Sequence, residues 1–223
     1  MGWRTTPPAG KMSEDTSGGF AMTAMPPRLT DVPALSPRPG EPFRFTREQY
    51  HEMDRLGFFA HVRVQRIRGE IVVMSAVNWP HVASLRKTRL ALEVAFAGIG
   101  WVNERNPLPT PDSDPEPDLS VIPGRFEDYT DHPPTALLVV EISATTLLED
   151  TTTMAEVYAT AAAPEYWVVD VPHRRLIVFR DPAPLPADLG GFAYRTRMEL
   201  LESDTVSPLA ASAAVLRVTD LLP

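Results

Sequence analysis

The clearest pattern of apolar positions lies in residues 137–171. Residues 137–140 form an apolar run of strand length that ends at Glu141, and because the run does not alternate it predicts a strand buried on both faces. Good helix formers follow in residues 150–162 until a proline stops them, and residues 166–171 form a second apolar strand. Strand, helix and strand in this order predict an α/β fold with a parallel or mixed sheet and the helix on one face.

The flanking sequence supplies further elements. We expect helices in residues 46–56 and 81–97, a hairpin in 63–74, strands at 101–106, 119–122 and 176–179, and short elements in 192–201 and 215–222. Residues 166–179 read as an exposed hairpin. Residues 1–42 are rich in Pro, Gly, Ser and Thr and have no apolar period, which predicts a disordered tail before a domain at 43–223.

Composition narrows the function classes. A net charge of −8 excludes a polycation that grips nucleic acid by charge alone, although a metal site is itself acidic. The chain has no cysteine, which excludes disulfides and thiolate zinc sites and fits a cytoplasmic protein. Apolar runs stay far below the roughly 20 residues of a membrane span, so we expect no membrane partner.

Two carboxylates are the main candidates for chemistry. Asp118 precedes one predicted strand and Glu141 ends another, and the two strands are far enough apart in sequence to be neighbours in the sheet. Such a pair can bind Mg²⁺, which prefers hard oxygen ligands, activates water and stabilises charge on a phosphate. The spacing alone is weak evidence, because many sheets carry Asp and Glu at strand ends.

Basic residues leave two interpretations open. Arg63, Arg66 and Arg68 lie on the first arm of the hairpin, either as a solvated strand face, which is the commoner case, or as a strip that faces phosphate. His81 opens a helix, where a lone histidine is more often a structural cap than a ligand.

Three motifs occur in a fixed order: PEPDLSVI at 115–122, LLVVEIS at 137–143 and PEYWVVD at 164–170. Together they resemble the Uma2 family, also called DUF820, which comprises restriction endonuclease-like proteins of the PD-(D/E)XK nuclease superfamily. The resemblance covers nearly all of the chain from residue 45 onward. It implies a restriction-endonuclease-like mixed sheet flanked by helices, Mg²⁺ or Mn²⁺ as cofactor, DNA as a possible partner and a homodimer that could pair through the hairpin at 166–179.

The resemblance also assigns roles to individual positions. Asp118 matches the metal-binding aspartate of the family and Glu141 its second acidic ligand. The catalytic lysine of the family falls at Met154, and Gln65 replaces a glutamate of the hairpin. Met154 carries neither charge nor hydrogen-bond donor, and the two lysines of the chain, Lys11 and Lys87, fall in the tail and on another helix.

The resemblance therefore implies a Mg²⁺-dependent endonuclease acting on DNA phosphodiesters, with a degenerate site and weak or no activity. Loss of one such electrostatic group typically costs on the order of 10²–10³ in rate. Two alternatives remain open. One is a non-catalytic relative that keeps the nuclease fold to bind nucleic acid or protein, and the other is a structural domain without phosphate chemistry.

Overall fold

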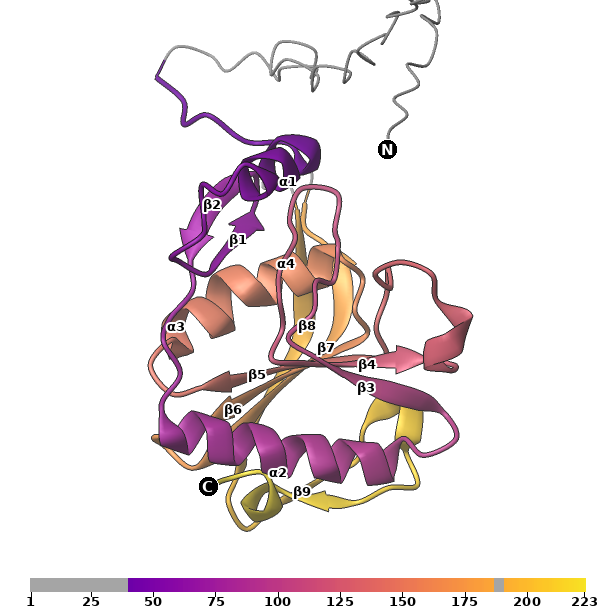
Figure 1. The fold of residues 1–223 in the computed structure, drawn as a ribbon. Coiled ribbons are helices and arrows are strands. Elements are labelled where there is room, and N and C mark those ends of the chain that lie inside the picture. Colours follow the sequence, from indigo (N-terminus) through magenta and orange to yellow (C-terminus); the bar gives the residue numbers. More distant parts are fainter. Residues whose placement is uncertain (1–39, 187–190) are drawn as a thin grey trace, which may run out of the picture. The chain divides into compact units, whose positions relative to one another are not determined.

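The computed structural model of the protein describes residues 40–186 and 191–223 (Figure 1). All but the last three residues of the predicted tail lie outside this range. The main elements are α1 (Arg47–Arg55), β1 (Val64–Ile67), β2 (Glu70–Val73), α2 (Trp79–Ala95), β3 (Gly100–Glu104), β4 (Leu119–Pro123), β5 (Leu138–Ser143), α3 (Leu147–Glu149), α4 (Ala155–Thr160), β6 (Glu165–Asp170), β7 (Arg175–Pro184), β8 (Phe192–Leu201), β9 (Thr205–Val206) and β10 (Leu216–Arg217).

Six of the strands form one mixed sheet in the order β3-β4-β5-β6-β7-β8. The pair β5 and β6 is parallel, because α3 and α4 connect them, and the other neighbouring pairs are antiparallel. Strands β1 and β2 form a separate hairpin. The predicted α/β fold with a mixed sheet is therefore confirmed.

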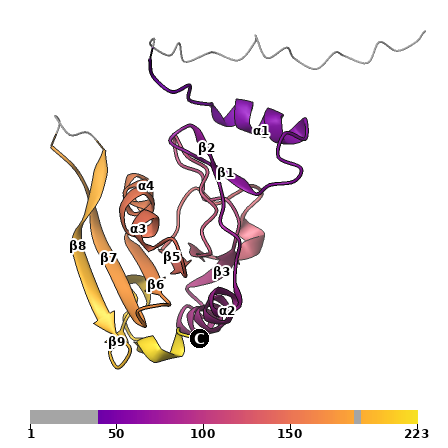
Figure 2. The same ribbon diagram turned by 90° about the vertical axis from the view of Figure 1, so that its left-hand side faces the viewer.

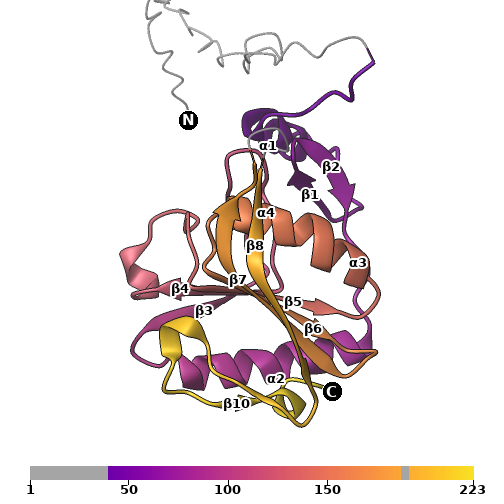
Figure 3. The same ribbon diagram turned by 180° about the vertical axis from the view of Figure 1, so that it is seen from behind.

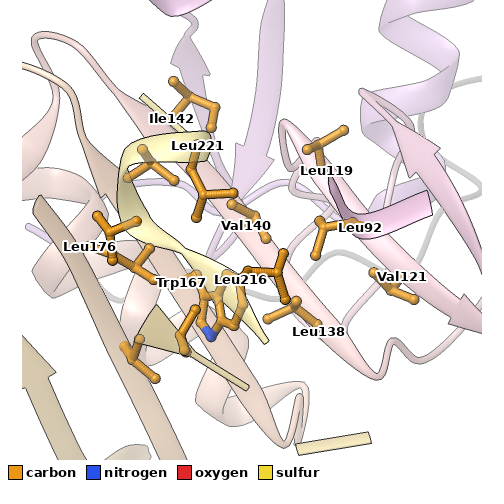
Figure 4. Packing of buried hydrophobic residues seen from close by; sticks show 14 of the residues in the cluster. Leu92, Leu119, Val121, Leu138, Val140, Ile142, Trp167, Leu176, Leu216 and Leu221 are labelled. Atoms are coloured by element: carbon orange, nitrogen blue, oxygen red, sulfur yellow. The ribbon is translucent and has the colours of Figure 1, made fainter. Parts of the chain in front are cut away.

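Helices cover both faces of this sheet. Helix α2 lies on one face and the α3–α4 segment on the other (Figure 1), and seen from behind, the C-terminal segment with β10 runs beside α2 (Figure 3). The β5 side chains alternate between the faces: Leu138, Val140 and Ile142 join a core with Leu92 and Trp167 (Figure 4). Val139 joins the core on the α4 side. Apolar neighbours on both sides explain why the strand shows no alternation in sequence.

Local signals fix where the helices begin. Thr46 and Gln49 form a reciprocal capping box at α1. Asn78 caps α2 by accepting a hydrogen bond from the His81 N–H at 3.1 Å. The interpretation of His81 as the cap is therefore wrong, and its side chain is free for another role.

Across residues 40–186 and 191–223, no helix is long and apolar enough to cross a bilayer.

Three expectations about elements need correction. Residues 166–179 are not an exposed hairpin, because β6 and the first half of β7, residues 176–179, are buried in the interior of the sheet. The segment at 192–201 is a full ten-residue edge strand, visible as the outer strand in Figure 2. The helix expected at 150–162 starts earlier and contains a π-helical turn at Asp150–Met154, where the backbone widens to i→i+5 hydrogen bonding.

Candidate active site

Asp118 and Glu141 face each other across the β4–β5 pair. Leu119 pairs with Val140 in the antiparallel register, so the preceding and following residues, Asp118 and Glu141, lie opposite each other. The Asp118 N–H donates to Oε2 of Glu141 at 3.1 Å. The two candidate ligands thus lie on neighbouring strands, as the sequence predicts, but Glu141 lies within β5 and not at its end, because the strand continues to Ser143.

Asp118 is surrounded by donors. Its Oδ2 accepts a hydrogen bond from the Ile142 N–H at 2.9 Å and lies 2.9 Å from Nε2 of His81. Its Oδ1 lies 3.6 Å from Nε of Arg105, which is longer than a hydrogen bond. Two basic side chains therefore flank this carboxylate from α2 and from the end of β3.

Glu141 lies on the α4 side of the sheet and is only partly exposed. Its Oε1 accepts a hydrogen bond from the Tyr158 hydroxyl at 2.7 Å. Loss of hydration raises the pKa of Glu141 well above its ordinary value, and the negative charges of Asp118 and Asp150 add to the effect. A cation in this position would favour the ionised form.

Asp150 adds a third carboxylate from the first position of the π-helical turn. The side chain is buried, and its Oδ2 accepts a hydrogen bond from the Thr146 hydroxyl at 2.6 Å. Burial raises the pKa of Asp150 from 3.8 to about 6, against the opposing effect of its hydrogen bonds. The Tyr166 hydroxyl donates to the backbone carbonyl of Asp150 at 2.9 Å and holds the turn in place.

The three carboxylates line one pocket of about 110 Å³ together with Gln65 and Met154. The Gln65 Oε1 accepts a hydrogen bond from the Glu116 N–H at 3.2 Å, so the amide is held by the loop before β4. The Met154 side chain is buried and also belongs to the core that contains Tyr158 and Ile67. Met154 thus borders the carboxylates while it packs as an apolar residue.

Sequence reasoning assigned no role in the pocket to Asp150, took His81 for a cap and missed Arg105. Arg105 has φ +51° directly after β3, in the left-handed region that costs a non-glycine residue roughly 1–2 kcal/mol. Its Nε and Nη2 are buried and have no hydrogen-bond partner among the described residues. Neither a positive φ in a non-glycine residue nor a contact across 13 residues leaves a periodic signal in the sequence. The PEPD motif at 115–118 marks the loop that Arg105 contacts, but it does not indicate the arginine itself.

The three arginines of the hairpin arm differ: Arg66 is buried, whereas Arg63 and Arg68 have exposed side chains that form ion pairs. Arg66 is buried, and its Nε bonds Oδ2 of Asp114 at 2.8 Å. Arg63 pairs with Glu116 at 2.8 Å, and Arg68 pairs with Glu156. The solvated reading is wrong for Arg66, whose guanidinium attaches the hairpin to the loop before β4.

These side chains suit a magnesium site in which the protein supplies only one or two of the ligands. No group of three or more His, Cys, Asp or Glu side chains in the described part of the chain is placed to hold a metal ion. Asp118 and Glu141 nevertheless supply hard oxygens at one pocket. Asp118 Oδ2 is engaged by the Ile142 N–H and by His81, but Asp118 Oδ1 and both oxygens of Glu141 each keep a lone pair for a further contact. Mg²⁺ is usually bound by one or two carboxylates plus waters and substrate phosphates, so the residues fit the ion.

Comparisons with known proteins identify the family and the fold. The sequence model of the family Uma2, described as "Putative restriction endonuclease", matches residues 47–207. The crystal structure of "a putative nuclease belonging to DUF820" from Anabaena variabilis ATCC 29413 superposes with a TM-score of 0.53 at 16% identity, over 71% of this chain and 88% of that one, which shows a shared fold. A search of curated proteins finds no match. Because the family match spans well over half of the sequence, this chain belongs to the Uma2 family.

Proposed function

We propose that the protein is a Mg²⁺-dependent phosphodiester hydrolase of the restriction-endonuclease type that acts on DNA through a degenerate site. The observation that carries the proposal is the placement of Asp118 and Glu141 opposite each other at a pocket that Met154 also lines. The family match supports DNA as the substrate.

In this proposal Asp118 and Glu141 hold the metal ion, which when bound would lower the pKa of water and neutralise charge on the phosphate. Tyr158 orients Glu141 through its 2.7 Å hydrogen bond, and the Ile142 N–H fixes one oxygen of Asp118. Asp150 adds negative charge that favours cation binding once it is ionised.

Two positions make the site weak. Met154 offers no charge where the family has its lysine, and one missing electrostatic group typically lowers the rate on the order of 10²–10³-fold. Gln65 is neutral, and its oxygen is already engaged by the Glu116 N–H. Its replacement of a glutamate therefore removes one negative charge from the pocket.

A second candidate is a non-catalytic relative that uses the same fold to bind nucleic acid or protein. The burial of Met154 among core residues favours this reading, because an apolar contact has replaced a catalytic one without damage to the packing.

Repair of the two positions tests the proposal. We expect the variant Met154→Lys with Gln65→Glu to cleave supercoiled plasmid in Mg²⁺ or Mn²⁺ on the order of 10²-fold faster than the parent. Adding Asp118→Ala should abolish the gain. Leu148→Lys, on the exposed side of the same helical segment, adds the same charge outside the pocket and should change nothing.

Two results would contradict the proposal. If the parent already cuts efficiently and Asp118→Ala is inactive, the site is not degenerate. If the double variant folds and binds metal but stays inert, the binding role is the better account.

A further inference from the structure

Arg105 reaches the pocket at a conformational cost that its own contacts do not repay. Its φ of +51° is unfavourable for a residue with a Cβ, and its N–H donates to the Asp118 carbonyl at a long 3.3 Å. The same conformation occurs at Arg68, Ala162, Arg174 and Asp181, so at Arg105 it gains meaning only together with the unpaired donors described next. Residues held in such conformations often lie at ligand sites, where the surrounding fold imposes the strain.

Two N–H donor groups of the Arg105 guanidinium make no hydrogen bond within the described residues. Nε and Nη2 are buried without a hydrogen-bond partner in the described ranges, and the nearest carboxylate oxygen, Oδ1 of Asp118, is 3.6 Å from Nε. An ion pair built for stability would close this gap with a direct, two-pronged contact, as Arg174 does with Glu202 at the surface. The Arg105 guanidinium therefore lies beside Asp118 without a direct hydrogen bond to it.

The charges around the pocket show what Arg105 can bind. The pocket is lined by five acidic residues, Glu116, Asp118, Glu141, Glu149 and Asp150, and by two arginines, Arg63 and Arg105. Arg63 is committed to Glu116 at 2.8 Å. Arg105 is thus the lining arginine with donors available to an incoming anion, next to the predicted metal ligands.

We propose that Arg105 binds a non-bridging oxygen pair of the substrate phosphodiester and supplies the positive charge that Met154 cannot. The planar guanidinium matches two phosphate oxygens at once, which an ammonium does not. This inference rests on the proposed function for its substrate class. It differs from that function in predicting phosphate binding by this residue whether or not the bond is cleaved.

The test measures binding separately from cleavage. A fluorescein-labelled DNA duplex is titrated with the full chain in EDTA, and anisotropy is recorded at several salt concentrations. We expect Arg105→Gln to weaken binding about tenfold and to reduce the slope of log affinity against log salt by about one, as the loss of one phosphate contact requires. Arg105→Lys should restore the slope but only part of the affinity. Arg89→Gln, on the exposed surface of α2, should have a smaller effect on both.

Arg105→Gly separates this role from a structural one. Glycine adopts positive φ freely, so if Arg105 serves phosphate binding, the variant should melt at the same temperature as the parent or higher while it loses DNA affinity. A structural partner of Asp118 would instead give a lower melting temperature with unchanged affinity, and that result would overturn the inference.

The remaining outcomes are also distinguishable. If every variant is inactive but Arg105→Gln still weakens DNA binding, the proposed hydrolysis fails and the role of Arg105 stands. If the parent binds no duplex at low salt and the Arg105 Nε–H resonance does not shift on titration with inorganic phosphate, the inference is wrong even if cleavage by another route is found.

Discussion

Asp150 should make the folded protein less stable as the pH rises. Its pKa is about 6 in the folded state against an ordinary value of 3.8, so the folded state favours the protonated form. A raised pKa contributes stability that is fully present below about pH 4 and is lost as the pH rises through about 6. The difference corresponds to about 3 kcal/mol at pH 8.

Asp150→Asn removes this cost while it keeps the shape of the side chain and an oxygen that can accept from Thr146. We expect the variant to exceed the parent in free energy of unfolding by about 2–3 kcal/mol at pH 8 and by about zero at pH 4. The assay is urea denaturation in EDTA from pH 4 to 8, followed by circular dichroism. Because the charge of Asp150 also raises the pKa of Glu141, the difference between the curves reports on Asp150 together with its effect on Glu141.

Asp54→Asn is the matched control, because Asp54 is exposed on α1 and loses the same charge. Its curve should run parallel to that of the parent. If the Asp150→Asn curve is also parallel, or if the variant is less stable at pH 8, then Asp150 is not the buried, disfavoured charge described above.

Two further predictions concern the metal site and the assembly. Tyr158→Phe removes a hydrogen bond that lowers the pKa of Glu141, so Mn²⁺ affinity measured by calorimetry should fall, and fall more at pH 6 than at pH 8; an equal loss at both would contradict this. We also propose a homodimer, because nucleases that cut duplexes often pair two sites by two-fold symmetry, and sedimentation at micromolar concentration should show about twice 24.6 kDa. A monomer alone would count against it.

The central strands and the helix between them could be predicted from the sequence because their signals are local. Uninterrupted apolar runs identify β5 and β6, and the helix between them makes the pair parallel. The neighbouring placement of Asp118 and Glu141 follows from two strands that pair in register. Burial on both faces of the sheet accounts for the uninterrupted apolar runs, so the runs in turn predict that burial.

The missed features depend on contacts between distant segments. Arg105 and His81 reach Asp118 from 13 and 37 residues away, and neither interrupts an apolar period. The fate of Arg66 was decided by Asp114, a carboxylate in a loop 48 residues later. A charged residue is expected to be exposed until its buried partner is known, which is why the burial of Arg66 could not be predicted.

Because of the π-helical turn at Asp150–Met154, the presence of the Asp150 carboxylate in the pocket depends on the number of residues in this turn. A π turn holds one more residue than the α-helical path between the same ends. Deletion of one residue from 151–153 would let the helix close into continuous α geometry, while the packing of α4 could persist. Each residue of an α-helix turns the chain by about 100°, so Asp150 would rotate off its present face. A single codon lost or gained here can therefore remove or restore a carboxylate without redesign of the fold.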